Sequence, residues 1–570
     1  MKHTFYMGNK TVVINLSGQF YQTAEEIVAS QGFSVFLKRY FQELAVRDIR
    51  VFRWLTNGRS LDEMVPSVIT IAKQLLVLSE VEISKTILNK LDRIKTLYIV
   101  EDAYNYWRSK QRFSVVNGNT LPTAVNNFID MDTHYNQLIL QLYRNCEEKL
   151  QGRSNKVYRQ MHSGTNASCV ISNYKWKTAP GYGHLRNIPF IIRVMLRTPI
   201  LFHFESNKRE GSFVEVEDNP VTSFQYNNKD WLCMPLKVND LLCYTYFHKD
   251  YMANGVSLAN LFELADEEEC HSRKPDLIVL FGNQDDKEQC GFYHDQKNDI
   301  WIGSVSDHWR AEYFGYIKKA ILTLHNLCKM SRGALPIHGS MMEIYFRDGS
   351  RKSLILIGDS GAGKSESIEA IRHLSALKKK EGKSIKRIEV VFDDMGSLKI
   401  SGNKVVANGT ETGAFVRLDD LSNASAYQDM ERSVFINPEK ENARVILPVT
   451  NYESVCADHQ VDMVLYANNY EEKTGVERFE SYEQGRQVFI DGKRMAMNTT
   501  QEKGLSSTYF ANPFGPMQKQ PLCQKLMDQI FAQLYANGVF VGQLFTNLGT
   551  EHKDKIEESA SELLDLLKKL

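Results

Sequence analysis

The chain has 570 residues, which at about 150 residues per domain allows three or four domains. Apolar residues make up 43% and charged residues 24% of the chain, a composition that excludes a disordered or fibrous protein. The 69 Lys plus Arg balance the 69 Asp plus Glu, so the sequence is not strongly basic as in nucleic-acid-binding domains. We therefore expect small-molecule partners and no nucleic acid.

The sequence predicts a cytoplasmic protein without a membrane partner. Residues 1–5 do not begin an uninterrupted apolar run, and no stretch of about 18 apolar residues occurs anywhere in the chain. The 9 cysteines are scattered and never form a Cys-x-x-Cys pair, which is typical of reduced, buried thiols. A disulfide framework or a structural zinc site is not expected.

Residues 1–150 are predicted to form a helical N-terminal region. From residue 23 to about residue 144, apolar side chains recur mostly at helical spacing, as in residues 65–77. The pattern does not indicate a chemistry, and a protein partner is a candidate ligand for this region.

Residues 151–330 are predicted to form a middle α/β domain. A segment rich in Ser, Asn, Gly and Lys, residues 151–183, separates it from the helical region. Short apolar runs then alternate with polar turns, as at residues 190–192 and 278–281, which favours a sheet. Helical spacing returns at residues 317–330.

Residues 331–570 are predicted to form a phosphate-binding domain with a mixed sheet. A buried strand is expected at residues 353–357, a helix at 366–377 and a second buried strand at 388–392. Residues 556–570 are amphipathic, which predicts a terminal helix docked on the protein rather than a membrane motif.

The strongest local signal is a phosphate loop between the first strand and the helix. Residues 358–365, GDSGAGKS, fit G-x-x-x-x-G-K-[ST] in the strand-to-helix context that the motif needs. Backbone N–H groups of such a loop converge on phosphate oxygens at a helix N-terminus; the candidate residues are Ser360, Gly361, Ala362 and Gly363. Lys364 adds a cation and Ser365 a hydroxyl ligand for Mg²⁺. The alternative is a chance glycine-rich turn.

An acidic pair, Asp393 and Asp394, follows the second strand. At the carboxyl edge of a strand beside a phosphate loop, a divalent cation can bridge carboxylates and phosphates. An ordinary acidic turn is the alternative, and the position after the phosphate loop favours a metal site.

Three further candidate sites do not indicate a function when each is considered alone. A Lys pair on a helix, as at residues 318–319, is usually a solvated face, and a lone histidine such as His338 is usually structural. Arg444 taken alone is typical of a surface ion pair.

Taken together, these segments resemble the phosphoenolpyruvate carboxykinase and HPr kinase superfamily. Residues 313–319, YFGYIKK, resemble the carboxykinase Y-x-G-x-x-K-K segment, and residues 336–340, PIHGS, resemble its M-H-C-S segment. Three later segments are similar to G-D-D-E, E-G-G-C-Y-A-K and E-N-T-R-V-x-x-P: residues 392–395, 411–417 and 441–448. A weaker similarity continues at residues 499–504 and 510–514.

The phosphate loop departs from the carboxykinase pattern. With Asp359 and the Ser365-Glu366 pair, it looks more like the HPr kinase version, G-D-S-G-x-G-K-S-E, than the carboxykinase version, G-x-S-G-T-G-K-T-T. The phosphoryl donor therefore stays open among ATP, GTP and pyrophosphate. The first 300 residues show no match to the family, and the arginine expected to hold the substrate carboxylate has three candidates: Arg186, Arg193 and Arg197.

The resemblance implies an α/β protein whose C-terminal domain has the carboxykinase phosphate-loop fold, and a lyase acting on oxaloacetate. Decarboxylation and phosphorylation would give phosphoenolpyruvate and CO₂, and the reverse reaction is equally implied. The resemblance places a transition metal, expected to be Mn²⁺, on Lys319, His338 and Asp394. Mg²⁺ would lie near Ser365 and Asp393. Lys364 and Arg444 would offset charge on the transferred phosphoryl group, and Tyr313 would line the substrate pocket.

Two alternative functions stay open. One is an HPr-kinase-like enzyme that phosphorylates a hydroxyl of a protein or small molecule, with Asp393 or Asp394 as general base. The other is a non-catalytic nucleotide-binding regulator that uses residues 1–150 for its partners. A metal site with Lys and His ligands would favour Mn²⁺ over Mg²⁺, whereas a regulator would bind nucleotide without turnover.

Overall fold

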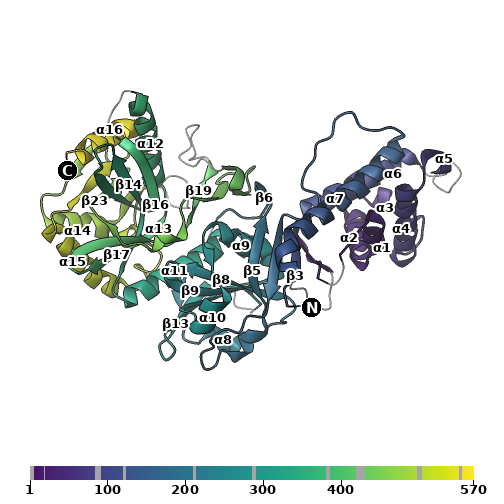
Figure 1. Ribbon diagram of the computed structural model, residues 1–570, viewed down its shortest axis with the longest axis horizontal. Coiled ribbons are helices and arrows are strands. Elements are labelled where there is room, and N and C mark those ends of the chain that lie inside the picture. Colours follow the sequence, from purple (N-terminus) through teal and green to yellow (C-terminus); the bar gives the residue numbers. More distant parts are fainter. Residues whose placement is uncertain are drawn as a thin grey trace.

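The computed structural model describes residues 5–17, 20–83, 92–119, 124–208, 213–284, 290–380, 385–418, 430–496, 504–550 and 555–569. The protein is a mixed α/β protein with 40% helix, 29% strand and several mixed sheets. A helical region lies at one end of its longest axis and the C-terminal region at the other (Figure 1). Within the described residues, no helix is long and apolar enough to cross a membrane. The predicted α/β class and helical N-terminal segment are confirmed.

One twelve-stranded sheet runs through the first two predicted domains. Its main path begins with β1 (Phe5–Met7), β2 (Thr11–Asn15), β3 (Gln111–Asn117), β4 (Ala167–Ser172) and β5 (Phe190–Leu196). It continues through β8 (Trp231–Val238), β9 (Leu241–His248), β11 (Leu277–Asn283), β13 (Ile300–Ser306), β12 (Cys290–Asp295) and β7 (Val214–Glu215), while β10 (Glu263–Leu264) pairs with β8. Because β1, β2 and β3 belong to it, the sheet crosses the division expected at residue 150.

The helices of the N-terminal region are insertions into this sheet. Strands β2, β3 and β4 pair in parallel, and parallel neighbours need long crossover connections. The first crossover contains α1 (Ala24–Ala29), α2 (Gln31–Arg47), α3 (Ile49–Thr56), α4 (Leu61–Val77), α5 (Glu80–Ile83) and α6 (Arg93–Ser109). The second contains α7 (Ala124–Gln151). A capping box of Ser60 and Glu63 starts α4.

A buried ion pair fixes α7 to the sheet. Asp132 of α7 is fully buried and accepts hydrogen bonds from Ser114 of β3 at 2.7 Å and from Thr165. Its second oxygen accepts from Arg197 Nε at 2.8 Å. A buried carboxylate is costly unless its oxygens are paired, so this network holds α7 in place. Arg197, a candidate for the substrate carboxylate, is thus engaged by Asp132.

The C-terminal region is built on a nine-stranded mixed sheet. Its order is β22 (His459–Gln460), β18 (Lys404–Gly409), β17 (Met395–Ser401), β14 (Leu335–Phe346), β15 (Arg351–Ile357), β23 (Met463–Asn468), β27 (Phe540–Phe545) and β24 (Val476–Arg478). Strand β16 (Ile385–Phe392) also pairs with β14. The phosphate loop and the acidic pair both follow strands of this sheet.

Helices cover both faces of the C-terminal sheet (Figure 1). Leu354 and Leu356 of β15 belong to one core cluster with α12 (Lys364–Lys380) and α16 (Ile556–Leu567). The alternate residues Ile355 and Ile357 belong to the cluster that contains α11 (Gly315–Ser331) and α15 (Gln520–Ala536). Burial on both faces explains the continuous apolar run of this strand, and α16 docks as a terminal helix as predicted.

A four-stranded sheet joins the middle and C-terminal regions. Its order is β19 (Gly413–Arg417), β21 (Arg444–Pro448), β20 (Val434–Ile436) and β6 (Ile200–Phe202). Strand β6 comes from the middle region and pairs in parallel with β20. The strands that carry Arg417 and Arg444 are therefore anchored on both regions.

Replacing Asp132 with alanine should lower the free energy of unfolding by about 3 kcal/mol, because the change leaves a mostly buried guanidinium without its counter-charge. Urea unfolding followed by circular dichroism should show a lower midpoint. Asp130→Ala, an exposed position on the same helix, is the matched control and should leave the midpoint in place. Equal midpoints for the two variants would contradict the role assigned to the Asp132 network.

Candidate active site

The phosphate loop connects β15 with α12, as its motif predicts. Gly361 and Gly363 have φ angles of 80° and 96°, a backbone conformation that favours glycine. Two side chains fix the loop: Thr546 Oγ1 donates to the Ala362 carbonyl at 2.7 Å, and Asn469 Nδ2 donates to the Gly361 carbonyl at 3.0 Å. The loop is thus a fixed turn ending at the N-terminus of α12, where backbone N–H groups favour anions.

Lys364 and Ser365 lie at the start of α12. Lys364 Nζ donates to the carbonyls of Gly358 at 2.7 Å and Asp359 at 3.2 Å. Ser365 Oγ donates to Asp393 Oδ2 at 3.2 Å. The serine hydroxyl and the aspartate carboxylate together offer the hard oxygen donors that Mg²⁺ prefers.

Asp359, the residue that makes the loop resemble the HPr kinase version, faces inward. It accepts hydrogen bonds from Arg494 Nε at 3.0 Å and Thr508 Oγ1 at 2.9 Å. Burial opposes its ionisation, but His338 and Arg494 hold the pKa of Asp359 well below its usual range. The side chain therefore braces the loop, and its presence does not identify the phosphoryl donor.

Lys319, His338 and Asp394 come together near the phosphate loop. Asp394 stands on the turn between β16 and β17 with a φ of 98°. One carboxylate oxygen lies 2.9 Å from His338 Nε2, and the other accepts from Lys319 Nζ at 3.1 Å. Lys318 Nζ also donates to Asp394, at 2.5 Å. Residues separated by up to 76 positions in the chain thus form one cluster.

The two neighbouring lysines differ in their protonation. Burial lowers the pKa of Lys319 to about 8, assisted by the charge of Lys318. Burial also disfavours charge on Lys318, but attraction to Asp394 and Glu411 outweighs it and raises the pKa of Lys318. These lysines keep the pKa of Asp394 well below its usual range despite burial. Lys318 is the permanent cation of the cluster, whereas Lys319 can lose its proton near neutral pH.

Glu411 is a second buried carboxyl group beside this cluster. It is 1% exposed, and its Oε1 lies 3.2 Å from Lys318 Nζ, although neither oxygen has a hydrogen-bond partner among the described residues. Burial raises the pKa of Glu411 to about 7. Its charge therefore changes near neutral pH.

The ring of His338 is oriented as a metal ligand would need to be. Its Nδ1 lies 3.1 Å from the Ala511 carbonyl, an acceptor that favours a proton on Nδ1. Nε2 lies at hydrogen-bond distance, 2.9 Å, from an Asp394 carboxylate oxygen, and both atoms become potential ligands when a cation replaces the proton between them. Nitrogen from His338 and Lys319 with oxygen from Asp394 forms a mixed donor set that suits a transition metal better than Mg²⁺. The described residues contain no group of three or more His, Cys, Asp or Glu that could hold a metal.

A pocket of about 70 Å³ is lined by residues from both parts of the site. Its lining comprises His338, Ser360, Gly361, Gly363, Lys364, Ser365, Glu366, Glu369, Asp393, Asp394, Phe415, Val416, Arg417 and Arg444. Most residues predicted from the sequence to bind phosphate or metal therefore face one space.

Two arginines form the wall between β19 and β21. Arg417 and Arg444 are directly opposite each other in the antiparallel register, and both line the pocket. The guanidinium of Arg444 lies 5.5 Å from the centre of the Phe415 ring, and its buried Nε has no hydrogen-bond partner within the described part of the chain. Like charges directly opposite on a sheet repel each other, so this arrangement favours an anion in the pocket.

Some predicted residues lie elsewhere. Tyr313 is buried against Phe415, with ring centres 6.1 Å apart, and is not part of the pocket lining. Ala362, within the phosphate loop, is fully buried and does not line the pocket. The three candidate arginines bond within the first two regions: Arg186 to Thr178, Arg193 to the Val125 carbonyl and Arg197 to Asp132. None of the three lines the pocket, and neither does Lys319, which contacts the site through its bond to Asp394.

Several residues of the site were not expected from the sequence. Glu411 is the first and Arg417 the last residue of the segment that is similar to E-G-G-C-Y-A-K. The resemblance could therefore have indicated both residues. Arg494 has no motif around it, and its pairing with Asp359 spans 135 positions. Residues 499–503 of the weaker similarity lie outside the described residues.

No family model matches the chain, and no curated protein matches it. The carboxykinase resemblance therefore depends on the ordered motifs and on the geometry of the pocket.

Mn²⁺ affinity should fall about tenfold for each pH unit below pH 8, because Lys319 must lose its proton before its nitrogen can bind a metal. Free Mn²⁺ measured by electron paramagnetic resonance between pH 6.5 and 8.5 tests this. Lys319→Met should weaken binding and flatten the profile, whereas Lys329→Met, on the same helix, should keep it. A flat profile in the unaltered protein would contradict a lysine ligand.

Proposed function

We propose that this protein is a phosphoenolpyruvate carboxykinase-like lyase. In this reaction oxaloacetate and a phosphoryl donor give phosphoenolpyruvate and CO₂, or the reverse. The observation that supports the proposal most is that His338 and Asp394 line one pocket with the phosphate loop, while Lys319 donates to Asp394. A phosphate loop alone serves many enzymes, and this second cluster is what separates the proposal from other phosphoryl-transfer functions.

Two groups of residues would serve different parts of the proposed reaction. Lys319, His338 and Asp394 would hold a divalent cation, which when bound supplies Lewis-acid chemistry for a carbonyl and the enolate derived from it. Ser365 and Asp393 offer oxygen ligands for a second cation beside the phosphate loop. Oxaloacetate is expected near the first cluster and the donor's terminal phosphate near Lys364.

The bonding changes fit this arrangement. The bond between the leaving carboxylate and C3 of oxaloacetate breaks, CO₂ departs, and the electron pair remains as an enolate. The enolate oxygen then attacks the terminal phosphorus while the bond to the donor's bridging oxygen breaks. Lys364, Arg417 and Arg444 surround this point with positive charge, which offsets charge on the transferred oxygens.

The hydroxyl-kinase alternative is less well supported. A general base needs a carboxylate that can accept a proton near neutral pH. Asp394 is held by two lysines and a histidine, and its pKa lies well below the usual range. Asp393 already accepts hydrogen bonds from Ser340 and Ser365. Both aspartates are therefore better suited to bind cations than to remove a proton from a hydroxyl.

The purified protein should form phosphoenolpyruvate from oxaloacetate with Mn²⁺ and one of ATP, GTP or pyrophosphate, each offered separately. A coupled assay follows the product, and the reverse reaction is run alongside. Lys319→Ala should abolish turnover and Lys329→Ala should retain it. Donor binding without product in either direction would reject the lyase and favour the regulator, while phosphorylation of a hydroxyl acceptor would favour the kinase.

Arg444→Ala should lower kcat/KM by about 100-fold or more and leave the melting temperature within a few degrees, because the guanidinium acts on the transferred charge and not on folding. Arg478→Ala is a matched control: this arginine lies 5.4 Å from the Phe540 ring centre, outside the pocket. A collapse of the Arg444→Ala fold, or equal activities of the two variants, would contradict the catalytic role.

A further inference from the structure

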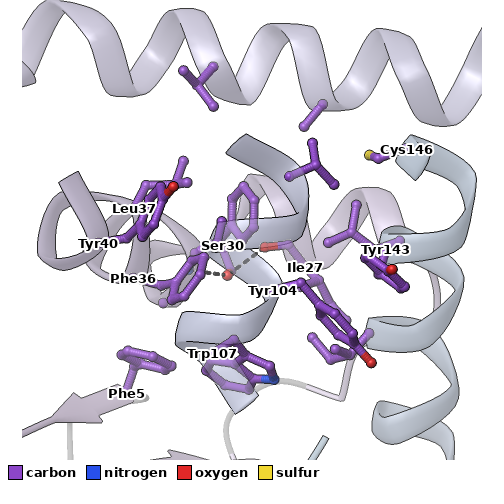
Figure 2. Close-up of a pocket in the computed structure, with 18 of the residues that line it drawn as sticks. Phe5, Ile27, Ser30, Phe36, Leu37, Tyr40, Tyr104, Trp107, Tyr143 and Cys146 are labelled. Atoms are coloured by element: carbon purple, nitrogen blue, oxygen red, sulfur yellow. Dashed lines mark hydrogen bonds between the residues drawn. The ribbon is translucent and has the colours of Figure 1, made fainter. Parts of the chain in front are cut away.

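The inserted helices surround a half-open apolar cavity of about 160 Å³ that shares no lining residue with the candidate active site. Its walls come from β1, β2, α1, α2, α4, α6 and α7. Side chains from these elements surround a common space, with Phe36 and Leu37 on one side and Tyr143 and Cys146 on another (Figure 2). Because several elements wall it, this is a cavity rather than one exposed helix face.

Three polar groups on the cavity wall are hydrogen-bonded to residues outside its lining. Tyr40 Oη donates to Asp102 at 2.8 Å, and Tyr143 Oη donates to Glu101 at 2.9 Å. Trp107 Nε1 donates to the Ser163 carbonyl at 2.6 Å. A water molecule in a buried site needs two to four polar partners, so these engaged groups make the cavity a poor site for water.

The hydroxyl of Ser30, at the centre of the wall, is also hydrogen-bonded within the protein. It donates to the Ile27 carbonyl at 2.7 Å and accepts from the Phe33 N–H at 3.1 Å (Figure 2). The hydroxyl therefore caps α2 rather than serving a ligand. A ligand here would gain affinity from apolar contact and not from hydrogen bonds.

The cavity has a flat wall. The rings of Tyr104 and Tyr143 stack with centres 3.7 Å apart and an interplanar angle of 9°. Phe36 meets Trp107 edge to face at 5.6 Å, which adds a second rigid aromatic surface. Rigid aromatic walls with an apolar interior favour a flat or slender apolar group.

We propose that this cavity is a binding site for an uncharged hydrocarbon group about the size of one aromatic ring. An apolar cavity of about 150 Å³ is large enough to bind benzene, and this half-open cavity has a similar volume and a mostly apolar lining. Protein interiors are otherwise close-packed, because a void of this size costs stability. The group could belong to a free aromatic molecule or to the end of an acyl chain, and the experiment separates these two sources.

Toluene and octanoate, added separately to the full-length protein, test the proposal. Ligand-detected NMR should show saturable binding of at least one of them. At 100 times its dissociation constant, the bound probe should raise the apparent melting temperature by about 3 °C or more. Binding of toluene alone identifies a free aromatic molecule, and tighter binding of octanoate identifies an acyl chain. Absence of saturable binding by both probes would overturn the proposal.

Ala103→Phe, which places a ring in the cavity, should abolish both the NMR signal and the thermal shift. Ala29→Phe makes the same change at an exposed position of α1 outside the cavity and should keep both. If Ala103→Phe fails to fold, Ala103→Leu fills less of the space and should weaken binding at least tenfold. Binding retained at full strength in a folded Ala103 variant would show that the probes bind elsewhere, which also overturns the proposal.

Discussion

The carboxylate of Asp394 is the interaction on which the candidate active site depends. Its two oxygens contact Lys318, Lys319 and His338, so helix α11 and strand β14 meet at one acidic side chain. The backbone contributes as well, since the Gly339 N–H donates to the Asp394 carbonyl at 3.0 Å. A positive φ at a non-glycine residue is uncommon, and here it is held in place by interactions at both the side chain and the backbone.

The same carboxylate explains why two adjacent lysines have different chemistry. Lys318 is fully buried, and the attraction of Asp394 and Glu411 keeps it charged. That fixed charge and burial together make the ammonium form of Lys319 unfavourable, which gives it a lowered pKa. Glu411 affects the charges of both lysines through its contact with Lys318. Because the pKa of Glu411 is about 7, the net charge of the cluster changes near neutral pH.

The parts of the structure that were predictable from sequence are those set by local chain geometry. The phosphate loop follows from its glycines and from the strand and helix around it, because backbone conformation is decided within a few residues. The docked helix α16 follows from its apolar stripe. Lys319, His338 and Asp394 were expected together only through their order in the family pattern, since nothing local joins residues this far apart.

What could not be predicted depends on contacts between distant segments. Arg197 was a candidate for the substrate carboxylate, but its partner Asp132 lies 65 positions away on an inserted helix. The helical pattern of the first 150 residues was correctly recognised, yet it did not reveal that short strands carry these helices on the sheet of the middle region. Strand pairing across long insertions leaves no periodic signal, because it is chosen by tertiary packing.

The arginine pair connects the fold with the proposed chemistry. Arg417 and Arg444 lie opposite each other on two paired strands, so their like charges repel. The two side chains stay close despite this repulsion because β21 also pairs with β20, and β20 pairs with β6 of the middle region. The middle region thus holds two cations at the mouth of a phosphate loop that belongs to the C-terminal sheet. In the proposed reaction, a transferred phosphoryl group would lie between the two guanidinium groups and replace their repulsion with attraction. Such a difference between the two states is the form of stabilisation that accelerates a reaction.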